Sequence, residues 1–109
     1  MHRTSWLALG FAFLLMAPLA VGAEGDGNAE TGKGLFEGKC SICHNVDSAD
    51  KKIGPGLKGV KDGKLPSGKD ATYQNILDNL NQGGGGMPAF EKLLTAEEKD
   101  HLIAYVMTL

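Results

Sequence analysis

Residues Cys40–His44 read CSICH and include both cysteines of the chain. A Cys-x-x-Cys-His run is the attachment signature of c-type haem. Two residues between the cysteines set their sulfurs at a separation that matches the two porphyrin vinyl groups, so Cys40 and Cys43 are each predicted to form a thioether. The next residue is then held against the ring face, and His44 is predicted to be the proximal ligand of the haem iron.

Three other interpretations of this motif imply different chemistry. A thioredoxin-like dithiol requires a βαβ setting and a lowered thiol pKa at a helix start, and the sequence shows no convincing strand alternation. A zinc site needs a fourth ligand, and the one other histidine after residue 23, His101, lies in a stretch with helical periodicity. A structural disulfide leaves the adjacent histidine unexplained. The predicted cofactor is therefore one covalently bound haem c.

The distal iron ligand is predicted to be Met87, which lies in the stretch NQGGGGMPAF at 81–90. Haem iron in cytochromes c is typically held by His plus Met, and the Met raises the reduction potential. Glycine backbone can press close to a flat ring, and Pro88 restricts the residue before it to extended geometry. The other candidates, His101 and Met107, lie in the last predicted helix, where a methionine is more often core packing. A high-spin or histidine-ligated iron is the alternative.

A further contact is predicted between His44 and the turn IGPGL at 53–57. A ligating histidine usually donates its other ring N–H to a carbonyl or carboxylate, which fixes the ring orientation and tunes the metal. Because the turn is tight and follows the motif closely, the carbonyl of Pro55 is the predicted acceptor.

The first part of the chain has the pattern of a secretory signal peptide. A short positive start is followed by an apolar run over 7–17, then Pro18, and then small residues that end at Ala23. A membrane-spanning helix needs roughly 20 apolar residues, whereas this run is shorter and interrupted. We predict a cleaved signal peptide over 1–23, a single monohaem domain over 24–109, export to the periplasm or a thylakoid-lumen-type compartment, and no stable membrane anchor.

The charge of the chain is slightly negative and unevenly distributed. The formal net charge is −2 for 109 residues, which argues against nucleic acid as a partner. Residues 51–69 contain a single acidic residue and are rich in lysine, so they form either a basic surface patch or a solvated loop. The lysines of this segment are Lys51, Lys52, Lys58, Lys61, Lys64 and Lys69.

The spacing of apolar residues predicts an all-α chain. A short helix is predicted over 29–39, and 45–69 is predicted to be a long irregular loop. Asp70 is the predicted N-cap of a second helix, and Thr95–Glu98 has the pattern of a capping box that starts a third. The apolar stripe of the second helix is Tyr73, Ile76, Leu77 and Leu80. That of the third is Leu102, Tyr105, Val106 and Leu109.

Taken together, these motifs resemble those of the class I c-type cytochromes. The resemblance rests on GKGLF at 32–36, CSICH, IGPGL, MPAF at 87–90 and LIAYV at 102–106. It implies a cytochrome c fold of three to four short helices and long loops wrapped around one covalently bound haem. It also supports Pro55 as the partner of His44. The Gly-rich approach to MPAF is similar to the cytochrome c6-like subgroup. The resemblance further implies that the first helix packs on the last through Gly32, Phe36, Leu102 and Tyr105.

The predicted function is electron transport by a one-electron Fe(II)/Fe(III) carrier, not an enzyme, that acts between exported or membrane redox proteins. Redox partners are expected to dock transiently at the exposed haem edge, and the carrier is expected to be a monomer. If Met87 is labile, the alternative is a haem-based ligand sensor or a peroxidase-like enzyme. An electron-entry subunit of a larger complex is another alternative.

Overall fold

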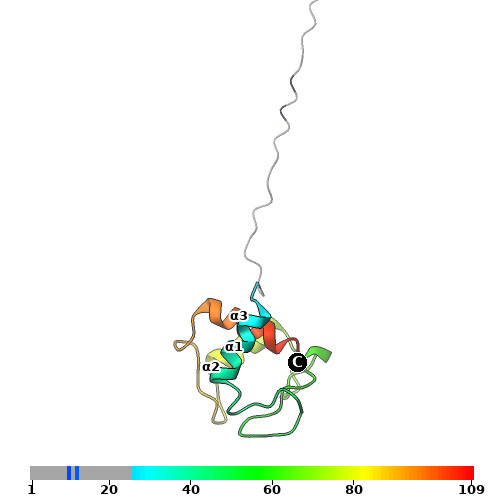
Figure 1. The fold of residues 1–109 in the computed structure, drawn as a ribbon, viewed down its shortest axis with the longest axis vertical. Helices are drawn as coiled ribbons and strands as arrows, with labels where there is room; N and C mark the ends of the chain where they lie inside the picture. Colours follow the sequence, from blue (N-terminus) through cyan, green and yellow to red (C-terminus); the bar gives the residue numbers. More distant parts are fainter. Residues whose placement is uncertain (1–9, 11, 13–25) are drawn as a thin grey trace, which may run out of the picture.

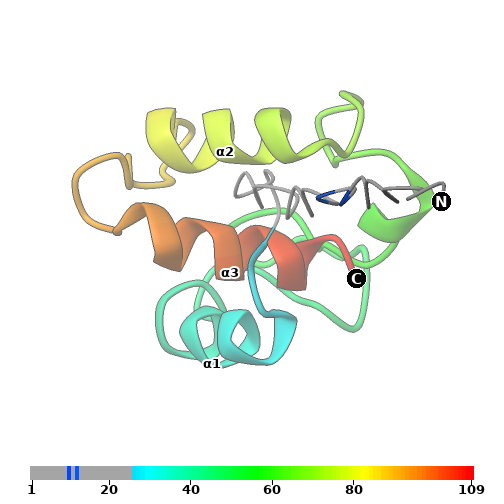
Figure 2. The same cartoon turned by 90° about the horizontal axis from the view of Figure 1, so that it is seen from above.

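The computed structural model describes residues 10, 12 and 26–109, and this part of the chain is all-α. Its pairs of β type are isolated bridges, Lys64 with Asp70 and Gly84 with Met87, so the described residues contain no sheet. The elements are α1 (Ala29–Lys39), the 3₁₀ turn η1 (Val60–Asp62), α2 (Tyr73–Gln82) and α3 (Ala96–Val106). Helix α3 lies between α1 and α2 (Figure 2). Long loops surround the helices (Figure 1).

The predicted signal peptide over 1–23 lies outside the described residues, apart from positions 10 and 12. From residue 26 onward the chain leads directly into α1. None of the helices in the described part of the chain has the length and apolarity needed to cross a membrane.

Helix α1 covers the predicted range and crosses α3 at close quarters. Its N-cap is Asn28, whose side chain accepts a hydrogen bond from the N–H of Thr31 at 2.9 Å. At the crossing point, a Cβ atom on Gly32 would lie 1.9 Å from the carbonyl oxygen of His101. One turn later, Phe36 packs edge-on against Tyr105 with ring centroids 5.4 Å apart. The helix packing implied by the resemblance is therefore present.

Helix α2 begins at a different cap from the one predicted. Thr72 is the N-cap, and its hydroxyl accepts a hydrogen bond from the N–H of Asn75 at 3.1 Å. The prediction of Asp70 as N-cap is wrong because its carboxylate pairs with the ammonium of Lys64 at 2.5 Å. The hydrogen bond from Lys64 also holds the pKa of Asp70 below its usual range. The Tyr73 hydroxyl, at the start of α2, donates to Asp100 of α3, and the following side chains match the predicted apolar stripe.

Helix α3 begins with the predicted capping box. The Thr95 hydroxyl accepts from the N–H of Glu98 at 3.1 Å, and the Glu98 carboxylate accepts from the N–H of Thr95 at 3.0 Å. The helix ends at Val106, so Leu109 lies beyond the stripe to which it was assigned. Its carbonyl oxygen instead accepts hydrogen bonds from the N–H groups of Gly59 and Lys61 and so ties the long loop to the end of the chain.

The buried side chains form two clusters that meet α3 from opposite sides. One cluster joins α2, α3 and the long loop, and the other joins α1, α3 and the loop before α3. Ile103 and Leu102 are their most deeply buried members. The first cluster consists of Val60, Leu65, Ile76, Leu80 and Ile103, and the second of Phe36, Leu94 and Leu102. The irregular segment 45–69 thus contributes directly to the core.

Two glycines of α1 provide a matched test of the helix crossing. Gly32→Ala is expected to lower the free energy of unfolding by about 1–3 kcal/mol, because the added methyl group would overlap the backbone of α3. Gly34→Ala is expected to raise it by about 0.5–1 kcal/mol, because no atom lies within 4 Å of its Cβ position and alanine is the better helix former. Urea unfolding measures both. Equal effects of the two substitutions would contradict the close crossing.

The capping box predicts a pH dependence of stability. The hydrogen bonds from Thr95, chiefly that from its backbone N–H, lower the pKa of Glu98. The ionised carboxylate therefore stabilises the folded state above about pH 4.3, the usual pKa of Glu, and this contribution is lost as the pH falls through the lowered folded-state pKa. Glutamine keeps the capping hydrogen bond without titrating.

We therefore expect the urea midpoints of wild type and Glu98→Gln to differ at about pH 7 and to converge on acidification to about pH 3. Glu37→Gln, which removes a carboxylate outside the cap, serves as the control. A difference between wild type and Glu98→Gln that is the same at both pH values would refute this role of the carboxylate.

Candidate functional site

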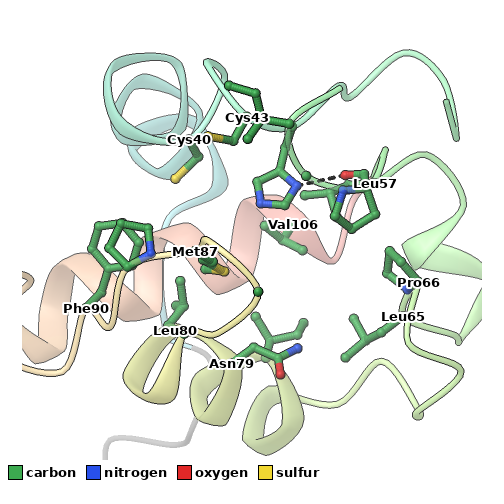
Figure 3. A pocket seen from close by; sticks show the side chains of 18 of the residues that line it. Cys40, Cys43, Leu57, Leu65, Pro66, Asn79, Leu80, Met87, Phe90 and Val106 are labelled. Atoms are coloured by element: carbon green, nitrogen blue, oxygen red, sulfur yellow. Dashed lines mark hydrogen bonds between the residues drawn. The ribbon is translucent and has the colours of Figure 1, made fainter. Parts of the chain in front are cut away.

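The helices and the long loops line an apolar, partly open cavity of about 340 Å³. Its volume lies in the range of about 300–1,000 Å³ that is typical of small-molecule and cofactor sites. Figure 3 shows Cys40 and Cys43 on one side of this pocket, and Leu65 and Pro66 on another. The sequence-predicted site residues that line it are Cys40, Cys43, His44, Pro55 and Met87. The apolar walls include Phe36, Leu57, Leu65, Ile76, Leu80, Phe90, Leu102 and Val106.

The CSICH segment forms a helical turn that directly follows α1. The N–H of Cys40 donates to the Phe36 carbonyl at 2.8 Å, and the N–H groups of Cys43 and His44 donate to the Cys40 carbonyl at 3.1 and 3.0 Å. Both cysteines are free in the structure. Burial, with a smaller contribution from Cys43, raises the pKa of the Cys40 thiol.

The imidazole of His44 is oriented by the turn that contains Pro55. Its Nδ1 lies 2.8 Å from the Pro55 carbonyl oxygen. Because a carbonyl can only accept, Nδ1 carries the hydrogen, and the lone pair of Nε2 is left free for a metal. Gly54 packs against the ring, since a Cβ there would lie 2.6 Å from His44 Cε1, and its N–H donates to the Cys43 carbonyl at 2.7 Å. The turn thus holds the imidazole from two directions.

The glycine run before Met87 forms a tightly folded arm, defined here as residues 83–90. The φ angles of Gly83–Gly86 are 60°, 119°, 61° and 96°, all in the region that side chains rarely adopt. Gly84 and Met87 exchange two backbone hydrogen bonds, of 2.9 and 3.1 Å. A Cβ on Gly83 would lie 2.5 Å from the Met87 carbonyl oxygen. The glycines therefore fold the chain back on itself, and Met87 is part of the cavity lining (Figure 3).

The two other candidates for the distal ligand lie away from the cavity lining. His101 is engaged elsewhere, because its Nδ1 accepts a hydrogen bond from the N–H of Asn28 at 2.8 Å. Met107 follows α3 and is 42% exposed. Among the residues that the structure describes, no group of three or more His, Cys, Asp or Glu side chains is placed to hold a metal ion.

Sequence reasoning missed part of the cavity wall. Leu57 belongs to the turn at 53–57, in which only Pro55 was assigned a role, and Leu65 and Pro66 belong to the segment that was predicted only as an irregular loop. All three line the cavity. The available signal was the presence of isolated apolar residues in an otherwise polar, lysine-rich stretch. With these walls, the site presents two thiols, an imidazole and a thioether around an apolar space, a donor set that fits haem c.

An all-α chain that gathers a Cys-x-x-Cys-His turn and a methionine arm around one apolar cavity has the architecture of a monohaem c-type cytochrome. Comparison with known proteins agrees. The family model described as "Cytochrome C oxidase, cbb3-type, subunit III" matches residues 27–106. Cytochrome c6 of Rippkaea orientalis is 32% identical over 97 residues, which cover 89% of this chain and 80% of the relative. The chain belongs to the class I c-type cytochromes.

More distant relatives and a solved structure support the same assignment. Cytochrome c type-1 of Ascaris suum is 29% identical over 98 residues, covering 74% of this chain and 88% of the relative. The crystal structure of cytochrome c6 from the diatom Phaeodactylum tricornutum superposes with a TM-score of 0.60 at 27% identity, covering 75% of this chain and 93% of that chain. Membership of this family implies an electron-carrier role and not an enzymatic one.

Substitutions in the arm test whether its glycines are needed for close approach. Gly83→Ala and Gly84→Ala both place a side chain at positive φ, which costs about 1–3 kcal/mol. Only the Gly83 methyl group would also overlap the Met87 carbonyl, because no atom lies within 4 Å of the Gly84 Cβ position. We therefore expect Gly83→Ala to lower the free energy of unfolding more than Gly84→Ala. The reverse order in urea unfolding would contradict the observed fold of the arm.

Proposed function

We propose that this chain is a one-electron carrier whose haem c is attached to Cys40 and Cys43 and ligated by His44 and Met87. The observation that carries this proposal is the convergence of these four side chains, from two segments far apart in the sequence, on one apolar cavity. When bound, haem c supplies an Fe(II)/Fe(III) couple, and the protein tunes its potential through ligands, burial and hydrogen bonds.

Each side chain has a defined part in holding the group. The thiols of Cys40 and Cys43 would each hold the group by addition across a vinyl double bond, with sulfur bonding to one carbon and hydrogen going to the other, so that no oxidant or reductant would be consumed. The Pro55 carbonyl keeps the hydrogen of His44 on Nδ1, so Nε2 serves as the proximal ligand. The thioether of Met87 serves as the distal ligand and raises the potential.

The hydrogen bonds of the arm favour a carrier over a ligand sensor or a peroxidase-like enzyme. If His44 and Met87 both hold the iron, they would leave no open site for a substrate at the metal. A sensor would require Met87 to leave readily. The arm is closed by its paired backbone bonds between Gly84 and Met87, and the N–H of Phe90 donates to the Leu80 carbonyl at 2.7 Å. These bonds oppose departure of the ligand.

A small apolar and basic surface beside the CSICH turn suits transient docking of a redox partner. Ile42 and Ile53 are 69% and 65% exposed. Lys51 is exposed and is one of the residues that line the cavity. The Lys52 ammonium donates to the Ser41 carbonyl at 3.0 Å, which keeps the two segments together. We propose that exported or membrane redox proteins with an acidic rim dock here through small, charge-steered contacts.

The same proposal includes export and a monomeric mature domain. The leader-like pattern over 1–23 is its support, and the carrier would occupy 24–109 in the periplasm or a thylakoid-lumen-type compartment. The matching family model is named after an oxidase subunit, so an electron-entry subunit is the second candidate. Purification from the exported fraction as a monomer supports the carrier, whereas stable co-purification with a membrane oxidase supports the subunit.

Ligation by Met87 is tested by removing its thioether. Ferric Met87→Ala is expected to lose the weak red absorption band of a thioether-ligated haem. Its reduction potential is expected to be lower than that of the wild type, by an amount within the roughly 0.8 V range over which haem ligands set the potential. Met107→Ala removes an exposed methionine after α3 and should retain both properties. Persistence of the band in Met87→Ala, or its loss in Met107→Ala, would show that the ligand has been misassigned.

A further inference from the structure

A buried lysine ties the segment that follows Met87 to α3. Lys99 is only 8% exposed, and its ammonium donates to the main-chain carbonyl of Glu91 at 2.9 Å. Burying an ammonium group is unfavourable unless it finds a partner. Lys99 also lies three and four residues before Leu102 and Ile103 and so shares the buried face of the helix. A lysine on that face calls for a role other than solubility.

The acceptor of this bond, the Glu91 carbonyl, directly follows the C-terminal end of the arm, which is called its distal base below. Phe90, which precedes Glu91, donates its N–H to the Leu80 carbonyl of α2 at 2.7 Å. At the proximal base, the N–H of Gly83 donates to the Asn79 carbonyl at 2.9 Å. Both backbone ties therefore lead to α2. The Lys99 bond adds a side-chain tie from the distal base to α3.

The hydrogen bonds of Phe90 and Lys99 together fix where the arm returns to the helices. If the Lys99 bond is absent, the distal base remains attached to α2 through Phe90 and is released from this bond to α3. Met87 lies only a few residues before Glu91. A larger motion of the Glu91 backbone is therefore transmitted to Met87 through the short Pro88–Phe90 segment. Lys99 is not among the residues that line the cavity.

We propose that Lys99 is a positioning residue that keeps the Met87 arm closed by tying Glu91 to α3. This inference rests on the proposed attachment of haem and ligation by Met87. It implies that Lys99 resists replacement of Met87 by an external ligand, although it does not itself touch the metal. The electron-carrier character of the protein would then depend in part on a charged group in its core.

The test is the equilibrium affinity of the ferric holoprotein for imidazole, a ligand that must displace Met87. Lys99→Met keeps a long apolar side chain and removes the donor, and we expect it to bind imidazole about tenfold more tightly, which corresponds to ~1.4 kcal/mol. Lys92→Met removes the same charge from an exposed position in the adjacent loop. It should change the affinity by less than about twofold, a shift of under ~0.5 kcal/mol.

A second control separates positioning from a general loss of stability. His101→Ala removes the acceptor of the Asn28 N–H and acts on another face of α3, since residues 99 and 101 lie about 200° apart around a helix. It should destabilise the fold without changing imidazole affinity. Amide hydrogen exchange at Phe90 provides a further readout and should accelerate about tenfold in Lys99→Met, again ~1.4 kcal/mol, and not in His101→Ala.

The outcomes distinguish this inference from the proposed function. Absence of the thioether band from the wild-type protein would overturn ligation by Met87 and this inference with it. If the band is present, unchanged imidazole affinity in Lys99→Met, or an equal rise in His101→Ala, overturns the role of Lys99 alone. Should Lys99→Met fail to fold, Lys99→Leu, which is shorter and also lacks a donor, is measured by the same criteria.

Discussion

The crossing of α1 and α3 at Gly32 is the contact on which the arrangement of the site depends. The two helices come from opposite ends of the described chain, and only a residue without a side chain allows the backbone of α1 to approach the His101 carbonyl so closely. Because the CSICH turn continues directly from α1, this contact also sets the position of Cys40 relative to α3. The chain between these helices is then constrained to pass around the cavity, and most of it does so without regular structure.

The loops are held in a fixed conformation by hydrogen bonds to residues at or near helix ends and by a few buried side chains. The carbonyl of Leu109 holds the segment at Gly59 and Lys61, and the carbonyl of Leu80 holds Phe90. Leu65 adds an apolar anchor in the core. Such attachments keep the walls of the cavity in place on both sides of a bound group. A site whose ligands change little between oxidation states suits electron transfer, and this connects the loop structure to the proposed role.

Local patterns in the sequence predicted most of the helical structure, and contacts between distant residues explain the differences. The capping box at Thr95 and the stripe of α2 were predicted correctly because they depend on residues three or four apart. Asp70 was misassigned because its partner, Lys64, reaches it across a turn that the helix pattern does not reveal.

At the site too, residues in short local motifs were predicted, whereas residues placed by contacts between distant segments were not. Four of its predicted residues came from one short motif and one glycine-flanked methionine, and the structure brings them to a single cavity. The wall formed by Leu57 and Leu65 was not predicted, because a long loop has no periodicity to reveal which of its side chains point inward. The burial of Lys99 was likewise missed, although its spacing from Leu102 was a usable signal.

The sharpest test of coordination by His44 and Met87 is X-ray absorption at the iron K edge of the ferric holoprotein. We expect a single sulfur donor at bonding distance together with nitrogen donors from the porphyrin and the imidazole. An iron surrounded only by nitrogen or oxygen donors would contradict the proposed coordination and would favour a ligand-binding role for the site.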